Sequence, residues 1–465
     1  MAASFHVENF GCRAARADGE AVGDRLRAAG LDAQAAASAD VVVVNTCSVT
    51  AEADRAARAF IRRAHRLNPE ARIVVTGCYA QRAPEELATL SGVAAVVGNS
   101  HMALAPEIIL KLLGRVPAHT NSGLIQILTP TDVEREQPAP PQVVWADDRF
   151  AHSFLEEPQV EPGTQTRPNL KIQEGCGNRC TFCVIPQTRG ASRSLAAESV
   201  LRQVEGFVAA GGNELVLSGI NLGRWGRDLA DSTPSRLAAL VREIFERTAL
   251  PRLRLSSIEP MDWDVELIGL MGEFGGARLA RHAHLPLQSG SDAVLRRMHR
   301  RYRPWHYAEK VEALTRAAGP ELTVGADVMA GFPGESEAEF EETLAMIRAL
   351  PFGYLHLFPF SPRPGTPGWT LHSERPVPRE AVEERMTALR ALAAERIEAH
   401  RRSFVGRALE AITLHTPAEL AARGLSAALS ENFLPVELVG AVEANRLVRV
   451  RVTGLNAAGE LAAVL

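Results

Sequence analysis

Several features that mark special classes of protein are missing from this sequence. No apolar run approaches the roughly 18 residues of a membrane span, so we expect no membrane association. The N-terminal segment MAASFHVENFGC has no basic stretch followed by an apolar core, which predicts no secretory signal and a cytoplasmic location. The net charge is only −4, which argues against a broadly basic surface that coats nucleic acid.

Cysteine is also scarce, because the 465 residues contain only six. A reduced compartment favours metal binding or catalysis over disulfide bonds for these residues. Cys176, Cys180 and Cys183 lie in one loop, GCGNRCTFC, with the spacing C-x3-C-x2-C. Three thiolates can hold a [4Fe-4S] cluster and leave one iron free for a substrate or cofactor. The alternatives are buried thiols or a zinc site, although a three-residue gap suits a cluster better than zinc.

The other three cysteines, Cys12, Cys47 and Cys78, are far apart in sequence, yet each follows the end of an apolar run. The first 115 residues alternate strand and helix patterns, which predicts a parallel sheet with helices on its faces. The predicted strands are Phe5–Phe10, Asp40–Asn45, Ile73–Gly77 and Val93–Gly98, and the predicted helices are Glu20–Gly30, Ala51–Leu67 and Ala80–Ser91. Because parallel strands end at one edge of a sheet, the three thiols should meet there and hold a second cluster.

The rest of the chain divides into three further parts. Residues 116–168 are rich in proline and polar residues, which predicts a linker. Residues 169–400 repeat the strand–helix pattern on a larger scale, with six predicted strands and therefore an incomplete (β/α)6 barrel. These strands are 170–174, 214–218, 252–256, 282–287, 323–330 and 354–360. Residues 401–465 carry strand patterns at 411–414, 434–442 and 447–452 with no helices between them, which predicts a small β-barrel.

The loop CGNRCTFCVIP resembles the signature of the radical S-adenosylmethionine superfamily. Together with FGC, NTCSVT and TGCYAQ around the upstream cysteines, it makes the chain similar to the methylthiotransferases from end to end. The resemblance implies an N-terminal cluster domain, a radical barrel and a C-terminal TRAM domain. It also implies two [4Fe-4S] clusters, S-adenosylmethionine, an electron donor of the flavodoxin or ferredoxin type and a sulfur donor system.

Cofactor contacts are expected where the barrel strands end. By analogy with the family, the second strand should meet the amino group of S-adenosylmethionine, the third and fourth its ribose, and the last two its adenine. The residues at these positions are Ser218, Gly219, Glu259, Gln288, Ser289, Gly331 and Phe360.

A second resemblance, to one branch of the family, indicates which substrate the enzyme modifies. The segment NTCSVTAEADRAARAFIRR is similar to the branch that acts on N6-threonylcarbamoyladenosine beside the tRNA anticodon. Ala15 stands where the family usually has Asn. Alternative substrates are isopentenyladenosine in tRNA and an aspartate of a ribosomal protein, and a non-enzymatic alternative is an iron–sulfur RNA-binding redox sensor. The sequence does not predict an oligomeric state.

Two arginine-rich segments are candidate phosphate contacts, with a solvated surface as the alternative for each. The arginines at 55, 58, 62 and 66 recur at helical spacing just beyond Cys47, and RRMHRRYR (296–303) holds five more. Phe433 in the tail is a candidate for stacking on a base.

Overall fold

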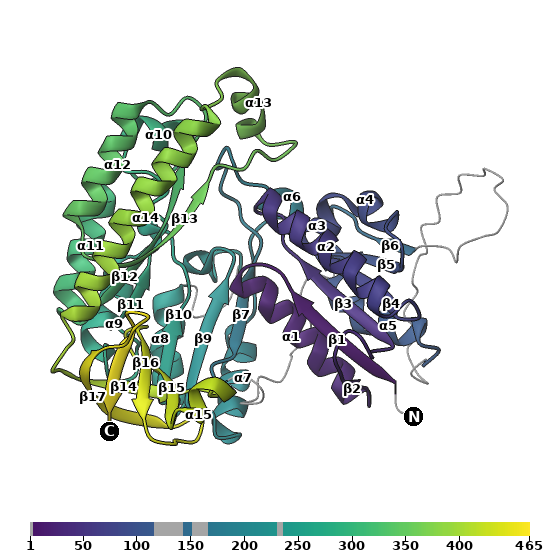
Figure 1. Cartoon of the computed structure of the whole chain (residues 1–465), viewed down its shortest axis with the longest axis horizontal. Helices are drawn as coiled ribbons and strands as arrows, with labels where there is room; N and C mark the ends of the chain where they lie inside the picture. The colour runs from purple at the N-terminus through teal and green to yellow at the C-terminus, as the bar shows by residue number, and fades with distance from the viewer. Residues whose placement is uncertain (1–2, 116–142, 151–165, 230–235) are drawn as a thin grey trace. The chain divides into compact units, whose positions relative to one another are not determined.

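The computed structural model describes residues 3–115, 143–150, 166–229 and 236–465. The chain divides into two compact units, which are drawn together in Figure 1 and described separately below. Unit 1 comprises Met1–Pro158 together with Gln187–Gly190, and unit 2 comprises Gln159–Pro186 and Ala191–Leu465. Unit 1 therefore includes four residues that follow the second cysteine triplet in the sequence.

Unit 1 is built on a parallel sheet with the strand order β2-β1-β3-β4-β5-β6. The strands are β1 (Ser4–Asn9), β2 (Asp32–Ala33), β3 (Val41–Thr46), β4 (Arg72–Gly77), β5 (Val93–Gly98) and β6 (Val143–Trp145). The helices are α1 (Arg13–Ala28), α2 (Ala51–Leu67), α3 (Cys78–Arg82), α4 (Pro84–Ala88), η1 (Asn99–Leu104), α5 (Ala105–Leu112) and the end of α6 (Ile185–Arg189).

Alternate residues of β3 enter two different hydrophobic cores, as the two-residue period of a strand requires. Val41 and Val43 pack with residues of α1 and α5, whereas Val42 and Val44 pack with residues of α2, α3 and α4. Helices on both faces explain why the central strands read as continuous apolar runs. The predicted parallel sheet is confirmed.

The elements of unit 1 differ from the sequence prediction in three places. Helix α1 begins at Arg13 rather than at Glu20. Gly19 lies inside this helix, where a Cβ would come within 1.8 Å of the Asn9 side chain, so only glycine fits there. The predicted helix 80–91 is divided into α3 and α4, because Pro84 has no N–H to continue the first. Strand β6 lies within the predicted linker and pairs with β5, while 116–142 and 151–165 of that linker lie outside the described residues.

Unit 2 begins with six parallel strands that run in chain order and carry helices between them. They are β7 (Asn169–Glu174), β9 (Glu214–Gly219), β10 (Arg252–Leu255), β11 (His282–His284), β12 (Thr323–Ala330) and β13 (Phe352–Pro359), with the short β8 (Arg193–Ser194) antiparallel to β7. The helices are α7 (Ala197–Ala209), η2 (Leu222–Arg224), α8 (Leu237–Arg247), η3 (Pro260–Asp262), α9 (Val265–Phe274), α10 (Asp292–Arg297), α11 (Pro304–Ala318), α12 (Glu337–Ala349), α13 (Pro367–Glu374) and α14 (Arg379–Arg402).

These strands form two sheet segments, β10-β9-β7-β8 and β11-β12-β13, rather than a closed ring. The arrangement confirms the predicted incomplete barrel. Strand β11 ends at His284, three residues earlier than predicted, because Pro286 cannot donate to a ladder.

The C-terminal residues of unit 2 form a closed five-stranded barrel, as predicted, in the order β14-β15-β16-β18-β17. Its elements are β14 (Ala408–Thr413), α15 (Ala418–Ala422), β15 (Leu425–Ser430), β16 (Pro435–Val439), β17 (Leu447–Leu455) and β18 (Leu461–Val464). It is attached to the strands before it by Glu431, which binds the Arg281 guanidinium at 2.8 Å, and by Asn432, which donates to the Glu321 carbonyl at 2.9 Å. Among the described residues, no helix has both the length and the apolar character needed to cross a membrane.

Candidate functional site

The three upstream cysteines lie at the carboxyl ends of neighbouring strands in unit 1. Cys12 follows β1 and caps the N-terminus of α1, Cys47 directly follows β3, and Cys78 is the first residue of α3 after β4. Strands β1, β3 and β4 are adjacent in the sheet, so the three thiols share one edge. Gly11, at φ +127°, allows this approach, because a Cβ there would lie 2.8 Å from the Cys47 Cβ and 3.2 Å from its Sγ.

Electrostatic coupling between these thiols also shows that they lie close together. Burial, together with the neighbouring Cys78 and Cys12 thiolates, raises the pKa of Cys47 to about 12, while Arg189 opposes the shift. Ionising several thiols together is costly without a compensating cation. A bound metal cluster supplies that positive charge, since thiolates are the form that binds metals.

Arg189 reaches the upstream site from the segment Gln187–Gly190. Its Nε donates to the Cys78 Sγ at 3.2 Å, and its Nη1 binds the Asp18 carboxylate at 3.1 Å. Asn99 donates from Nδ2 to the same Sγ at 3.4 Å and to the Thr188 carbonyl at 2.9 Å. Sequence reasoning missed Arg189 and Asn99, and only the position of Asn99 just after a strand end hinted at a role.

Ala15, the departure from the usual family pattern, is buried in the first turn of α1. Its carbonyl accepts a hydrogen bond from Asn45 Nδ2, and Asn45 Nδ2 also donates to the Asn9 side chain at 3.0 Å. Two asparagines from β1 and β3 therefore hold the start of α1 at the strand ends.

The downstream cysteines occupy the loop that follows β7 in unit 2. All three are partly exposed, as a site that binds further ligands requires. Burial, together with the Cys180 and Cys176 thiolates, raises the pKa of Cys183 to about 12. The Cys176 Sγ accepts from the Asn178 backbone N–H at 3.4 Å and from Asn221 Nδ2 at 3.5 Å.

Arg300 contacts the downstream site as Arg189 contacts the upstream one. Its Nη1 donates to the Cys180 Sγ at 3.3 Å, and its Nη2 binds both oxygens of Glu259 at 2.8 and 2.6 Å. Its Nε donates to the Tyr302 hydroxyl at 3.2 Å. Glu259, predicted as a ribose contact, is therefore already bound to a guanidinium, and its contact with S-adenosylmethionine stays a prediction.

Two of the predicted cofactor contacts have buried polar atoms with no hydrogen-bond partner among the described residues. They are Ser218 Oγ, near the end of β9, and Gln288 Oε1, beyond β11. Gln288 also adopts a positive φ of 63°, which costs energy for a residue with a side chain. Gly219 packs against Gln173, where an added Cβ would lie 2.9 Å from the Gln173 Cβ. Unsatisfied buried polar atoms need an explanation, and a bound polar cofactor supplies one.

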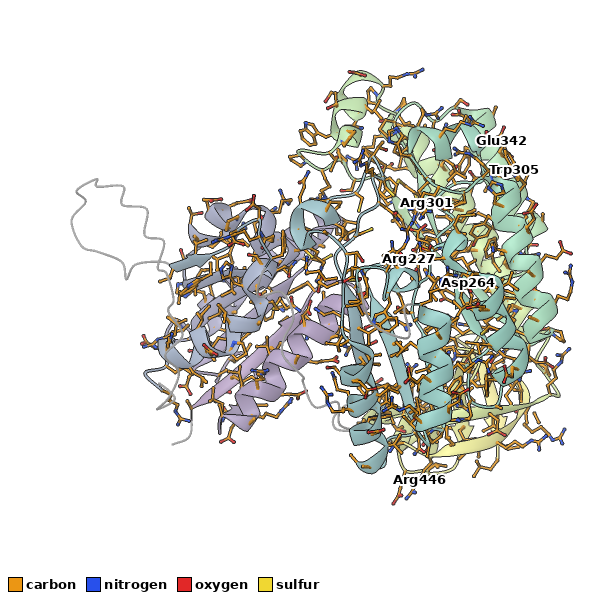
Figure 2. The ribbon with its side chains drawn as sticks, turned by 180° about the vertical axis from the view of Figure 1, so that it is seen from behind. Arg227, Asp264, Arg301, Trp305, Glu342 and Arg446 are labelled. Carbon is orange, nitrogen blue, oxygen red and sulfur yellow. The ribbon has the colours of Figure 1, made fainter. Side chains whose placement is uncertain are left out.

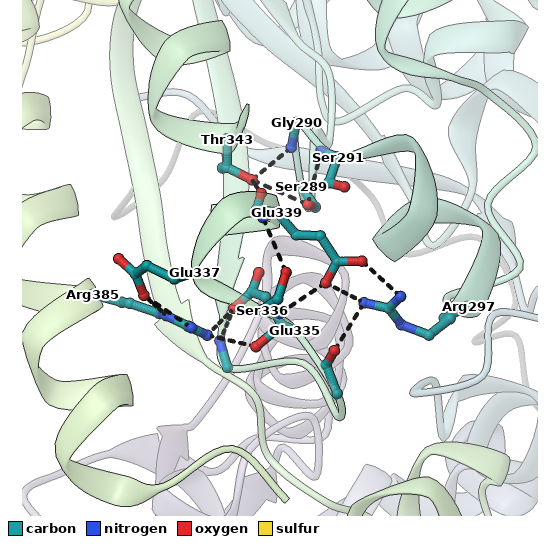
Figure 3. Close-up of polar contacts among 12 residues, drawn as sticks. Ser289, Gly290, Ser291, Arg297, Glu335, Ser336, Glu337, Glu339, Thr343 and Arg385 are labelled. Carbon is teal, nitrogen blue, oxygen red and sulfur yellow. Dashed lines mark hydrogen bonds and ion pairs between the residues drawn. The ribbon is translucent and has the colours of Figure 1, made fainter. Parts of the chain in front are cut away.

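Figure 3 shows that Ser289 is part of a separate hydrogen-bond network at the start of α12. Its hydroxyl lies 3.1 Å from the Thr343 hydroxyl and accepts from the Ser291 backbone N–H at 3.1 Å. Gly331 donates its N–H to Glu335 at 2.7 Å. The structure gives both residues roles in fixing loops, and contact with the cofactor stays a prediction for each.

Two aromatic residues that the sequence singled out have different surroundings. Phe360, predicted to pack on adenine, is half-buried and packs edge-on against Phe332 with ring centroids 5.5 Å apart. Phe433, predicted to stack on RNA, instead packs against His282 with ring centroids 4.5 Å apart and beneath the Arg254 guanidinium at 5.3 Å. The Phe433 ring thus joins the small barrel to the strands of the same unit, and its stacking on a base stays a prediction.

The arginine-rich segment 296–303 is largely neutralised by nearby carboxylates. Arg297 binds Glu339 at 2.8 Å, as Figure 3 shows, and Arg300 binds Glu259. Arg296 and Arg303 both lie near Asp292, at 2.9 and 3.4 Å. Arg301 is exposed and is labelled in Figure 2.

The arginine stripe on α2 retains more exposed cations. Arg55, Arg62 and Arg66 are exposed, and the helix begins four residues after Cys47. Arg58 is instead half-buried and pairs with Glu86 at 3.0 Å.

Comparison with known proteins shows the family to which the chain belongs. Residues 4–98 match a family described as "Uncharacterized protein family UPF0004", and residues 170–347 match the radical SAM superfamily. A threonylcarbamoyladenosine tRNA methylthiotransferase MtaB from Bacillus subtilis is 35% identical over 97% of this chain and 93% of its own length. A tRNA-2-methylthio-N(6)-dimethylallyladenosine synthase from Erythrobacter litoralis is 33% identical over 89% of this chain and 87% of its own.

A solved structure supports the fold. The radical S-adenosylmethionine methyltransferase TsrM from Kitasatospora setae, with cobalamin and a [4Fe-4S] cluster bound, matches with a TM-score of 0.55 and 16% identity. The match covers 79% of this chain and 74% of that one.

Proposed function

The chain belongs to the family of tRNA methylthiotransferases, and we propose that it adds a methylthio group to C2 of N6-threonylcarbamoyladenosine beside the anticodon of tRNA. The observation that carries this proposal is the pair of cysteine triplets, one at the ends of three strands and the other in one loop, each contacted by one arginine. The identity of 35% to a threonylcarbamoyladenosine methylthiotransferase over 97% of this chain favours this adenosine.

The two triplets have different roles in this proposal. When bound, the downstream cluster and S-adenosylmethionine would supply the radical chemistry that activates the C–H bond, the upstream cluster would supply the sulfur, and a second S-adenosylmethionine would supply the methyl group. Cys176, Cys180 and Cys183 would hold the downstream cluster as thiolates, and the positive charge of the cluster would offset the burial that raises the pKa of Cys176 and Cys183. The reaction needs an electron donor of the flavodoxin or ferredoxin type and a system that restores sulfur.

Residues around the downstream loop position the cofactors. The bidentate pair of Arg300 with Glu259 fixes the guanidinium that donates to Cys180, and a bidentate pair holds its geometry more firmly than a single contact. Ser218 and Gln288 offer unsatisfied polar atoms to S-adenosylmethionine at the ends of two strands.

For the tRNA, the exposed arginines of α2 offer phosphate contacts next to the upstream site. Arg55, Arg62 and Arg66 form a local positive stripe, which suffices for backbone binding even on a chain of net charge −4. A tRNA substrate places the enzyme in the cytoplasm.

The decisive experiment is mass spectrometry of tRNA nucleosides from a strain in which the gene is deleted. We expect the methylthio derivative of threonylcarbamoyladenosine to disappear, the unmodified parent nucleoside to accumulate, and a plasmid copy to restore the product. A copy with Cys180→Ala is the matched control and should not restore it. An unchanged nucleoside profile in the deletion strain would refute the assignment.

The second candidate substrate is isopentenyladenosine, which the identity of 33% to a dimethylallyladenosine synthase favours. The same nucleoside profile separates the two, since only the methylthio derivative of isopentenyladenosine would then be lost. If both nucleosides are unchanged, digestion of ribosomal proteins followed by mass spectrometry tests for a methylthio-aspartate.

A further inference from the structure

A cluster of two histidines and one aspartate lies in unit 2 and involves none of the six cysteines. It is formed by His284 on β11, Asp327 on β12 and His356 on β13, and the ligand atoms of the three side chains all lie within 4.8 Å of one another. Strand register explains their meeting. Asp327 pairs with His356, and His284 pairs with Gly325, two residues before Asp327. Because side chains two residues apart share one face, all three point to the same side of the sheet.

The other face of β12 is the apolar one. Val324, Ala326 and Val328 are fully buried in the large core that also includes residues of α11, α12 and α14. The histidine–aspartate cluster therefore lies on the face turned away from these helices. A polar cluster on that face is not explained by core packing.

The distances within the cluster fit a shared cation. His284 Nε2 lies 3.4 Å from the Asp327 Oδ1, and His356 Nδ1 lies 3.2 Å from the same oxygen. Ligand bonds of about 2.0–2.2 Å place neighbouring donor atoms about 3.0–3.6 Å apart at ordinary coordination angles. Both measured separations fall within that interval.

His284 gives a second and independent indication. Its side chain is only 8% exposed, and its Nδ1 has no hydrogen-bond partner among the described residues. Its Nε2 faces only the Asp327 carboxylate, at 3.4 Å and without the geometry of a hydrogen bond. A buried imidazole in this state is unfavourable, because it has lost water and gained no hydrogen bond of good geometry. A cation between Nε2 and the Asp327 carboxylate removes that cost.

The neighbouring groups hold the cluster rigid and accessible. Tyr354 packs its ring against both His284 and His356, with centroids 5.8 and 5.2 Å apart, and its hydroxyl lies 2.7 Å from His282 Nε2. His356 is 62% exposed and Asp327 is 25% exposed, so an ion can enter and solvent can reach it. Three protein ligands with an open side are the pattern of a metal site that exchanges its fourth ligand.

We propose that His284, Asp327 and His356 bind one divalent cation of the zinc class, with at least one coordination position open to water or to a carboxylate or hydroxyl oxygen. Two imidazoles and one carboxylate are borderline ligands that favour such cations over magnesium or calcium. This site is additional to the two cysteine sites, and the proposal does not depend on which nucleoside is modified.

The test uses the full chain with both iron–sulfur clusters assembled under anaerobic conditions. The protein is incubated with zinc sulfate, freed of excess metal by gel filtration, and analysed for zinc and iron. We expect about one zinc per chain in the wild type and at least a tenfold loss of zinc affinity in Asp327→Asn and His356→Ala. His415→Ala, which removes an exposed histidine elsewhere, is the matched control and should keep its zinc.

Zinc X-ray absorption separates this site from the cysteines. The expected spectrum has nitrogen and oxygen neighbours at about 2.0–2.1 Å, whereas zinc in a cysteine site has sulfur at about 2.3 Å. Unchanged iron content shows that the variants fold, since both clusters depend on folded units. The proposal is overturned if the wild type retains no zinc, if the zinc spectrum shows sulfur ligands, or if both variants bind zinc as the wild type does.

Discussion

The two cysteine sites are assembled in different ways but are contacted by the same kinds of side chain. The upstream site collects single cysteines from the ends of β1, β3 and β4, whereas the downstream site takes all three from one loop. At each site one arginine and one asparagine donate to cysteine sulfur, and the arginine also binds a carboxylate. Two cysteine triplets assembled by different topologies therefore receive similar hydrogen-bond donors.

The sites differ in how deeply these donors are buried. The upstream ion pair of Arg189 and Asp18 is fully buried, with side chains 1% and 2% exposed. The downstream pair of Arg300 and Glu259 is more open, with side chains 5% and 20% exposed. A site that must admit S-adenosylmethionine keeps an opening, whereas the upstream arrangement favours retention of a fixed structure.

The largest expected effect comes from removing one ligand at each site. Cys180→Ala and Cys47→Ala should each lose about half of the roughly eight irons, because two thiolates hold a four-iron cluster poorly. Cys180→Ala should make no 5′-deoxyadenosine, whereas Cys47→Ala should still make it but form no methylthio nucleoside. Both products are measured by mass spectrometry after incubation with reductant, S-adenosylmethionine and threonylcarbamoyl-modified tRNA.

The two variants are each other's control, since each should leave the other triplet intact. If Cys47→Ala formed the methylthio product at the wild-type rate, this cysteine would be structural. The upstream site would then not be the source of the sulfur. Cleavage of S-adenosylmethionine by Cys180→Ala would contradict the radical assignment.

A smaller effect should separate the two arginines. Arg189→Met leaves the Asp18 carboxylate buried without that guanidinium, and breaking a buried ion pair costs about 3–5 kcal/mol. Arg300→Met should cost less, about 1–3 kcal/mol, because Glu259 can reach solvent. Hydrogen exchange read by mass spectrometry localises each effect, with faster exchange expected in β3 and β4 for Arg189→Met and in β10 for Arg300→Met.

The double variant Asp18→Asn with Arg189→Met is the control for charge burial. It should recover part of the lost protection in unit 1, because the neutral amide is cheaper to bury than the carboxylate. Equal losses from Arg189→Met and Arg300→Met would show that the difference in burial between the sites has no energetic consequence.

The sequence predicted where the cysteines lie better than it predicted the residues that surround them. Cys12, Cys47 and Cys78 could be placed together because parallel strands end at a common edge and each cysteine follows an apolar run. Arg189 could not, since it lies 111 residues from Cys78 and no local pattern links the two. Its contact depends on four residues that belong to unit 1 although they follow the downstream loop.

Errors in the fold prediction have the same origin. The first helix was predicted to begin at Glu20, but α1 begins at Arg13 and includes Gly19, where Asn9 leaves no room for a side chain. Strand β6 was hidden in a proline-rich stretch, since three residues are too few to show a two-residue period. The contact of Phe433 with His282 was likewise not predicted, because it depends on packing that no sequence pattern records.

The smallest expected effect concerns the two asparagines and tests whether the donors tune the clusters. A hydrogen bond to a thiolate sulfur stabilises the more negative, reduced cluster, so its removal lowers the reduction potential. Asn221→Ala removes the donor to Cys176, and Asn99→Ala removes the donor to Cys78. A contribution of about 0.5–1.5 kcal/mol corresponds to about 20–60 mV for a one-electron couple. Redox titration followed by electron paramagnetic resonance should show the downward shift in the downstream cluster for Asn221→Ala and in the upstream cluster for Asn99→Ala.

Each variant serves as the control for the other, because its own donor contacts only one triplet. A shift of both clusters in either variant would indicate a structural change instead, and no shift in either would mean that contacts of 3.4–3.5 Å are too long to matter.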